Sequence, residues 1–232
     1  MTNPSHRPTL LPLDADAVVW NTPPGERAEA VAHRPLVILM HGFGADERDL
    51  LSLGDALHPA VLTASLRAPL PAAGGYAWFP LDSFEEATTP DLAMANAAVA
   101  GVLDWLESVH ALARTCGPVG LLGFSQGGAM VTHLLRHHPE QFACGVVLSG
   151  FTISGLVSGD EALAQIRPQV YWGRGQADPL IDPGAVQRTR EFLTAHTAST
   201  ERSFAGLGHG VSPQEAEEAL RFLLQHLSPA TG

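Results

Sequence analysis

Short apolar runs alternate with longer stretches of helical periodicity along most of the chain. The apolar runs predict strands at residues 36–40, 61–66, 119–124, 145–148 and 170–172. The periodic stretches predict helices at residues 47–57, 92–114, 127–138, 184–196 and 213–227. This alternation predicts an α/β fold with a mostly parallel central sheet and helices on both faces, in which ligands bind beyond the carboxyl ends of the strands.

The chain shows no internal repeat and no linker long enough to separate two domains. Its 232 residues, 45% of them hydrophobic, are enough to bury one substantial core. We therefore expect residues 1–232 to form a single α/β domain, in which about 1–16 are a flexible or extended N-terminal segment.

The strand predicted at 119–124 runs into Gly123-Phe124-Ser125-Gln126-Gly127, directly before a predicted helix. A serine on such a strained strand-to-helix turn is the nucleophile elbow of serine hydrolases, and glycines two residues away on either side avoid a collision of side chains. The turn exposes the hydroxyl and aims the N-terminus of the helix at negative charge that develops beside it. Ser125 is therefore the candidate nucleophile.

A serine nucleophile needs a histidine as its base and a carboxylate that fixes the tautomer of that histidine. In hydrolases with this elbow the chain order is serine, acid, histidine, so the base follows Ser125. Of the histidines after it, only His209 lies in a loop flanked by glycines, because a capping box at 212–215 starts the next helix just beyond it. We predict His209 as the general base, with stabilisation of a turn as the alternative.

The candidate acid is Asp178, which lies in the loop after the strand predicted at 170–172. Its nearest rival, Asp182, precedes Pro183 and a helical stretch, so the role of N-cap is sufficient for it. Asp160 and Glu161 lie in a polar stretch that is expected to be a solvated loop.

An oxyanion hole requires backbone N–H groups beside the nucleophile. One is predicted at Gln126, directly after the serine, and the other at Phe43, in the loop His41-Gly42-Phe43-Gly44 that follows an earlier strand. His41 precedes the serine, in an order that this arrangement does not use, so we expect it to form hydrogen bonds within its own loop.

Two further features carry candidate chemistry. Trp78 and Phe79 lie in a segment rich in proline and glycine that could wall a substrate pocket, or could equally anchor a long loop to the core. His133 and His137 are four residues apart on one predicted helix, but no carboxylate cluster accompanies them. We expect a solvated helix face there, with no metal and no cofactor.

The charge balance narrows the possible partners. The formal net charge is −11, and all 13 basic residues are arginine. No basic stripe is available for nucleic acid, and mechanisms that need a lysine are excluded.

The sequence has no signal-like N-terminus and no run of 18 apolar residues, so we expect a cytoplasmic protein without integral membrane association. Cys116 and Cys144 are expected to be small buried residues.

Four motifs together resemble the phospholipase/carboxylesterase family of α/β-hydrolases, which includes the acyl-protein thioesterases. They are His41-Gly42-Phe43-Gly44-Ala45-Asp46, Gly123-Phe124-Ser125-Gln126-Gly127-Gly128, Gly175-Gln176-Ala177-Asp178-Pro179 and Gly208-His209-Gly210-Val211. The resemblance runs from about Leu36 to Leu227. It implies an α/β-hydrolase fold, Ser125, Asp178 and His209 as the catalytic triad, and the N–H groups of Phe43 and Gln126 as the oxyanion hole.

The same resemblance implies hydrolysis of esters or thioesters without a cofactor. Phe43 stands where depalmitoylating members carry leucine, and Ser149-Gly150-Phe151 departs from their usual Ser-Gly-Trp/Tyr-Leu-Pro. The sequence therefore looks more like the bacterial carboxylesterase branch, in which small-molecule esters are the substrates. A lysophospholipase or acyl-protein thioesterase on the same triad is the alternative, and a binding module without turnover is a distant one. Homodimers occur in the family, and a homodimer is possible here.

Overall fold

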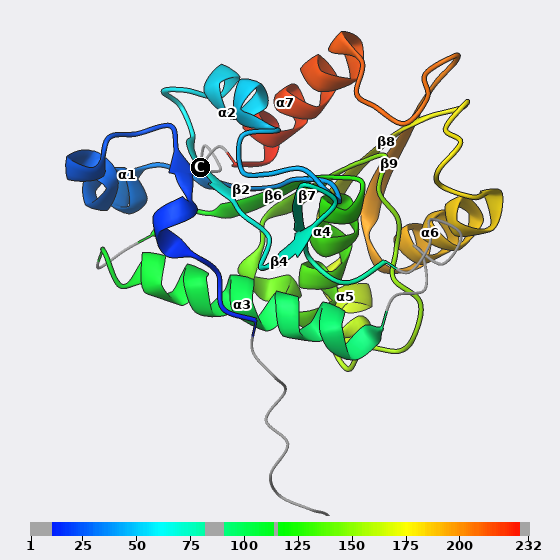
Figure 1. Cartoon of the computed structure of the whole chain (residues 1–232), viewed down its shortest axis with the longest axis horizontal. Helices are drawn as coiled ribbons and strands as arrows, with labels where there is room; N and C mark the ends of the chain where they lie inside the picture. The colour runs from blue at the N-terminus through cyan, green and yellow to red at the C-terminus, as the bar shows by residue number, and fades with distance from the viewer. Residues whose placement is uncertain (1–10, 82–90, 114–115, 228–232) are drawn as a thin grey trace, which may run out of the picture.

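A seven-stranded sheet forms the centre of the structure, a computed structural model that describes residues 11–81, 91–113 and 116–227. Its strand order is β1-β3-β2-β6-β7-β8-β9 (Figure 1). The strands are β1 (Val19–Trp20), β2 (Leu36–Met40), β3 (Leu62–Leu66), β6 (Val119–Phe124), β7 (Cys144–Leu148), β8 (Gln169–Gly175) and β9 (Ala198–Phe204). β1 is antiparallel to β3 and all other neighbours in this sheet are parallel, which confirms the mostly parallel α/β fold.

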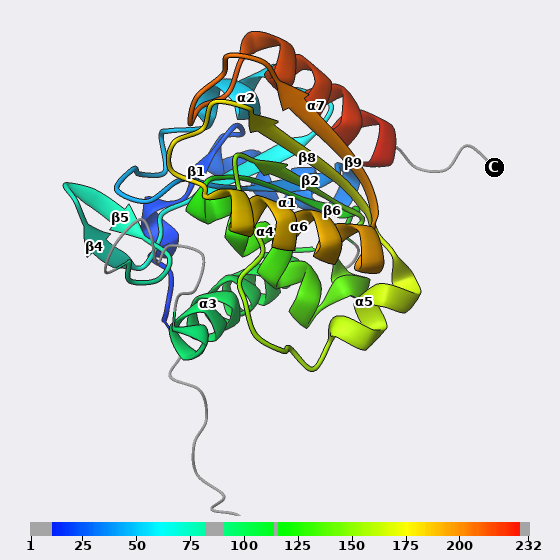
Figure 2. The same cartoon turned by 90° about the vertical axis from the view of Figure 1, so that its right-hand side faces the viewer.

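Helices cover both faces of this sheet. Figures 1 and 2 show α2 and α7 on one face, and α3, α4, α5 and α6 on the other. The helices are α1 (Arg27–His33), α2 (Leu51–Ala56), α3 (Leu92–His110), α4 (Gln126–His137), α5 (Asp160–Ile166), α6 (Pro183–His196) and α7 (Pro213–Leu227). A separate hairpin of β4 (Leu70–Ala72) and β5 (Gly75–Ala77) projects from the domain.

Strand β2 shows how the core is divided between the two helical layers. Val37 and Leu39 are buried in a cluster with Leu223 of α7. Ile38 and Met40 point the other way, into the cluster formed with α3 and α4. Because successive side chains of a strand face opposite sides, a strand covered on both faces is apolar throughout, which is why it appears in the sequence as a continuous hydrophobic run.

β9, α1 and α5 have no counterpart among the elements predicted above. β9 is an edge strand that pairs only with β8 in this sheet, and its sequence Ser-Thr-Glu-Arg-Ser at 199–203 lacks the apolar run of a buried strand. α1 and α5 have seven residues each, too few for a helical period to be recognised. α2 covers only the second half of the helix predicted at 47–57.

The described part of the N-terminal segment is held against α3. The amide of Leu11 donates to the carbonyl of Ala97, and Asp14 caps a single 3-10 turn at Ala15–Ala17. Residues 11–14 have no regular secondary structure and Asp14 is extended, as expected, whereas the 3-10 turn contradicts an extended conformation at 15–16. Residues 1–10 lie outside the described structure. By length and composition α3 itself could cross a membrane, but half of its apolar window is buried inside the protein, as in a core helix.

The two cysteines differ in their surroundings. Cys144 on β7 is buried, and this burial raises the pKa of its thiol to about 12. Cys116 is exposed, so the expectation of a small buried residue is wrong for it. An exposed thiol at this position lies in a loop and has no packing role that the sequence pattern could reveal.

The capping box predicted at the start of α7 is present. The Glu215 amide donates to Ser212 Oγ at 3.1 Å, and the Ser212 amide donates to Glu215 Oε2 at 3.4 Å. The side chain of Glu215 is nevertheless completely buried, and its Oε1 has no hydrogen-bond partner among the described residues. Burial raises the pKa of Glu215 to about 7.

We expect the buried Glu215 to weaken the fold above neutral pH. Its pKa is about 7 in the folded protein against 4.5 for an ordinary glutamate, so the folded state binds the proton more tightly and the free energy of unfolding falls as pH rises through 7. Glu215→Gln keeps the capping geometry without the charge. It should raise the free energy of unfolding by about 1–3 kcal/mol at pH 8 and change it little at pH 5, measured by urea denaturation.

Glu217→Gln is the matched control, because Glu217 lies on the same helix with a side chain that is 74% exposed. It should have a near-zero effect at both pH values. A Glu215→Gln protein that is no more stable than the unmodified protein at pH 8 would contradict the assignment of a buried charge.

Candidate active site

Ser125 lies at the junction of β6 and α4, on a backbone turn with φ 53° and ψ −116°. This left-handed region is costly for a residue with a side chain. A Cβ on Gly123 would overlap the carbonyl oxygen of Gly127, and a Cβ on Gly127 would overlap that of Met40. The two glycines predicted at the elbow are therefore required by close backbone contacts, and the strained turn is held in place by the strands around it.

The structure brings together the three residues predicted for the triad. His209 Nε2 lies 2.9 Å from Ser125 Oγ, and His209 Nδ1 lies 2.8 Å from Asp178 Oδ2. The other carboxylate oxygen of Asp178 accepts hydrogen bonds from the amides of Leu180 and Ile181. With Nδ1 donating to the carboxylate, Nε2 is left as an acceptor for the serine proton.

The loops that carry the acid and the histidine are fastened to each other. β8 extends to Gly175, three residues beyond the predicted strand, and ends where the amide of Ala177 donates to the carbonyl of Leu207. Ser149 Oγ, after β7, donates to the carbonyl of Gly210 at 3.3 Å. The ring of Phe124 packs on His209 with 5.0 Å between centroids. The imidazole is therefore positioned from several strand ends at once.

The loop after β2 lies beside the serine, as an oxyanion loop requires. A Cβ added at Gly42 would lie 3.5 Å from the Cβ of Ser125. His41 Nε2 accepts from the amide of Ala68, so Nδ1 carries the proton and donates to the carbonyl of Gly42. Burial lowers the pKa of His41, which keeps the ring neutral. The bond to Gly42 confirms the prediction that His41 forms hydrogen bonds within its own loop, whereas Ala68 belongs to the segment after β3. Phe43 follows Gly42 in this loop.

An ion pair holds the far end of this loop. Glu47 is buried, and its carboxylate accepts two hydrogen bonds of 2.7 Å from Arg67, just after β3. These hydrogen bonds lower the pKa of Glu47 to about 2. The Arg67 guanidinium also lies 4.7 Å from the ring centroid of Tyr76 on β5. The loop and the β4–β5 hairpin are thus attached to the same arginine.

Gln126 has two roles at the site, one through its backbone and one through its side chain. It is the first residue of α4, so its backbone N–H has no partner within the helix. Its side-chain amide accepts from the amide of Trp78 and donates to the carbonyl of Phe79, both at 2.8 Å. This second role, a clamp between the elbow and the aromatic segment, was not predicted because the partners are almost 50 residues away in sequence.

Trp78 and Phe79 are both fully buried. The indole N–H of Trp78 donates to the carbonyl of His41 at 2.9 Å. Of the two roles considered above, these positions support the anchoring of the loop to the core, and neither residue lines the groove or the cavity described below. The aromatic content of the segment signals burial here, and sequence alone could not distinguish it from a binding wall.

A buried arginine fastens the nucleophile helix to the segment that follows β7. Arg136 of α4 is 2% exposed and makes a bidentate pair with Asp160, with Nε–Oδ1 and Nη2–Oδ2 distances of 2.7 and 2.8 Å. It also donates to the carbonyls of Ile153 and Gly155. The expectation of a solvated loop at Asp160 is therefore wrong, since this residue opens α5 as an ion-pair partner, while Glu161 is exposed.

Contrary to expectation, the histidine pair on α4 does not form a solvated face, although His137 is partly exposed. His133 is fully buried, and Nε2 atoms of both His133 and His137 lie within 3.0 Å of Asn96 Oδ1 on α3. Burial lowers the pKa of His133 to about 3, so it remains neutral. The part of the chain that the structure describes contains no cluster of three or more residues suited to hold a metal.

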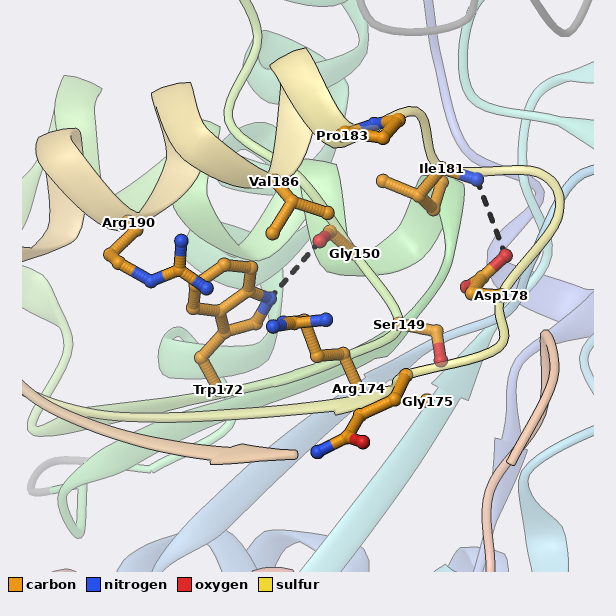
Figure 3. Close-up of a pocket in the computed structure, with 11 residues that line it drawn as sticks. Ser149, Gly150, Trp172, Arg174, Gly175, Asp178, Ile181, Pro183, Val186 and Arg190 are labelled. Atoms are coloured by element: carbon orange, nitrogen blue, oxygen red, sulfur yellow. Dashed lines mark hydrogen bonds between the residues drawn. The ribbon is translucent and has the colours of Figure 1, made fainter. Parts of the chain in front are cut away.

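Two hollows lie next to the elbow and the loops that carry Asp178 and His209. A groove of about 360 Å³ between α2 and the start of α7 is mostly apolar, with Leu50, Leu53, Phe124 and Val211 among its lining residues. A cavity of about 300 Å³ lies against Trp172 and reaches Asp178 (Figure 3). Both are at the small end of the range for ligand pockets.

A mostly parallel sheet with a nucleophile elbow after one strand, and an acid and a histidine on later loops, defines an α/β-hydrolase. Residues 27–227 match the family model described as Phospholipase/Carboxylesterase, and the chain belongs to this family. The assignment agrees with the resemblance carried by the four motifs.

Relatives cover most of the chain. It is 26% identical to Putative hydrolase MhqD of Bacillus subtilis, over 79% of this chain and 90% of that protein. It is 26% identical to Acyl-protein thioesterase 1 of Cryptococcus neoformans, over 84% of this chain and 94% of that protein. The crystal structure of a Bacillus cereus carboxylesterase has the same fold, with a TM-score of 0.75 at 17% identity, and the match covers 90% of this chain and 93% of that one. The chain is thus a hydrolase of the carboxylesterase and thioesterase type.

The two aspartates near the end of β8 provide a matched test of the site. Asp178 contacts His209, whereas Asp182 accepts from the amide of Ala185 as the N-cap of α6. Asp178→Asn should lower kcat for an ester substrate by roughly 10²–10⁴ without loss of stability, because the amide favours the wrong imidazole tautomer. Asp182→Asn should leave kcat and the melting temperature nearly unchanged, since asparagine is an equally good N-cap. Equal losses of kcat in the two variants would exclude Asp178 as the acid.

Proposed function

We propose that this protein is a serine carboxylesterase that hydrolyses small-molecule esters of small to medium acyl chains through an acyl-enzyme. The observation that carries the proposal is the continuous hydrogen-bonded row from Ser125 through His209 to Asp178. Membership of the phospholipase/carboxylesterase family supports the same chemistry.

In the first half of the reaction, Ser125 Oγ attacks the ester carbonyl while its proton passes to His209 Nε2. A bond forms between Oγ and the carbonyl carbon, and the carbonyl oxygen becomes an oxyanion. When the intermediate collapses, the bond from carbon to the leaving oxygen breaks, and His209 returns its proton to the departing alcohol. Asp178 stabilises the imidazolium in between and holds its orientation.

In the second half, water takes the place of the alcohol. His209 accepts a proton from the water as its oxygen bonds to the acyl carbon, and the bond to Ser125 then breaks as Oγ recovers that proton. The carboxylic acid is released and the enzyme is regenerated. We assign the oxyanion at both stages to the backbone N–H groups of Gln126 and Phe43, and the loss of one such donor costs about 3–4 kcal/mol of transition-state stabilisation in comparable enzymes.

The mostly apolar groove of about 360 Å³ is lined by Phe124, which precedes Ser125, and by Val211 of the histidine loop. Its small volume supports a limited acyl chain length. Hydrolysis of thioesters or lysophospholipids is the second candidate. The likeness to an acyl-protein thioesterase over 84% of the chain favours it, since the same triad can cleave either bond.

Replacement of the nucleophile tests the mechanism. Ser125→Ala should lower kcat by roughly 10³–10⁶ while the melting temperature changes little, because the hydroxyl serves chemistry and not packing. A fluorophosphonate probe should label the unmodified protein rapidly and the variant not at all. Ser108→Ala, at a serine of α3 whose hydroxyl donates to the carbonyl of Trp105, should still be labelled. Undiminished ester hydrolysis by Ser125→Ala would refute the proposal.

A series of nitrophenyl esters and acyl thioesters of increasing chain length separates the two candidate functions. For the carboxylesterase we expect kcat/KM to be highest for short or medium acyl groups and to fall for long ones. A kcat/KM that continues to rise to long chains, with thioesters preferred over the matching esters, would favour the thioesterase. Both outcomes presuppose the same Ser125 chemistry, so the series tests only the substrate.

A further inference from the structure

The reaction steps above place no substrate group in the cavity of about 300 Å³ between β8, the start of α6 and the loop of Asp178, although Asp178 itself lines it (Figure 3). It differs from the apolar groove because two arginines, Arg174 of β8 and Arg190 of α6, form one end of it. Their guanidinium carbons lie 5.7 and 5.8 Å from the ring centroid of Trp172. Figure 3 shows the two groups flanking the indole, with Asp178 at the opposite end of the cavity.

The arginine end carries an excess of positive charge. Both arginines bind one carboxylate, that of Glu201 on β9, so two positive charges face a single negative one. Arg190 uses Nε and Nη2 on Glu201 and Nη1 on Gln187. The hydrogen bond of Arg174 that the structure gives within the described residues comes from Nε alone, which leaves its two Nη groups as donors.

The opposite end of the cavity suits an apolar group. Ile181 and Pro183 lie toward this end, and Val186 lies between them and the arginines (Figure 3). Asp178 also faces this end, but its two oxygens already accept from the amides of Leu180 and Ile181 and from His209. An anionic group would therefore be repelled from Asp178 and attracted to Arg174. The difference in charge between the two ends of the cavity therefore orients a ligand, with its anionic group toward Arg174 and its apolar part toward Asp178.

We propose that this cavity is a binding site for a small monocarboxylate with an aromatic or branched apolar body. The carboxylate binds the Nη groups of Arg174 beside Trp172, a geometry that planar guanidinium donors favour, and the body packs on Ile181 and Val186. The volume limits the ligand to a small molecule. The inference rests on the cavity alone and is independent of whether the chain hydrolyses esters.

Benzoate is a suitable probe, and benzamide is its neutral counterpart of nearly the same shape. Titration of the whole chain, followed by calorimetry and by the indole N–H resonance of Trp172 in an NMR spectrum, should show saturable binding of benzoate. That resonance is assigned with a Trp172→Phe protein. Benzamide should bind at least about tenfold more weakly, because it cannot form the charge-assisted hydrogen bonds.

Two substitutions should change the affinity in opposite directions. Arg174→Gln removes the donors and should weaken benzoate binding by about tenfold, whereas Glu201→Gln removes the competing carboxylate and should tighten it by about threefold or more. A variant that merely damages the fold cannot produce the second result. Arg221→Gln is the control, because Arg221 pairs with Glu217 on the exposed side of α7 and should leave the affinity unchanged.

Three results would overturn the proposal. The first is equal affinity for benzoate and benzamide. The second is a change of affinity in the same direction in Arg174→Gln and Glu201→Gln. The third is benzoate binding that leaves the Trp172 indole resonance unperturbed, which would place the ligand elsewhere on the protein.

Discussion

The close backbone contact at the start of α4 is the constraint on which the rest of the site depends. Gly127 approaches the carbonyl of Met40 on β2, and Gly123 approaches Gly127 itself, at distances that leave no room for a Cβ. This contact drives the helix N-terminus against the sheet and forces the intervening Ser125 into a positive φ. The strain at one residue is supported by two central strands, which are among the most deeply buried parts of the protein.

The fold and the reacting groups could be predicted because each depends on a local requirement. The elbow needs glycines at fixed spacing, β2 and β6 are buried on both faces and hence apolar throughout, and His209 is confined to a loop by the cap of the next helix. Each of these requirements determines which residue types occur within a few positions of one another in the sequence. Parallel strands then bring their carboxyl ends to one edge, so residues 84 positions apart meet.

The features that were not predicted depend on partners distant in sequence. Arg136 can be buried because Asp160 and two carbonyl groups of a later segment accept the hydrogen bonds of its guanidinium group. No residue close to Arg136 in sequence indicates that these partners exist. His133 is buried against Asn96 in the same way. β9 was not predicted because a strand at the edge of the sheet can be polar, so it lacks the apolar run that indicates a buried strand. A polar residue in a sequence pattern is expected to be solvated, yet several polar residues here join elements inside the protein.

The absence of lysine gives these polar attachments a common property. The guanidinium groups of Arg67, Arg136 and Arg190 remain protonated at any pH that a protein survives, so the pairs they form with carboxylates are not broken by alkali. Each can be opened only when its carboxylate is neutralised, and the pKa of about 2 at Glu47 shows how strongly one of them resists this. The arginine–carboxylate pairs that hold the segments around the site are thus disrupted by strong acid but not by alkali.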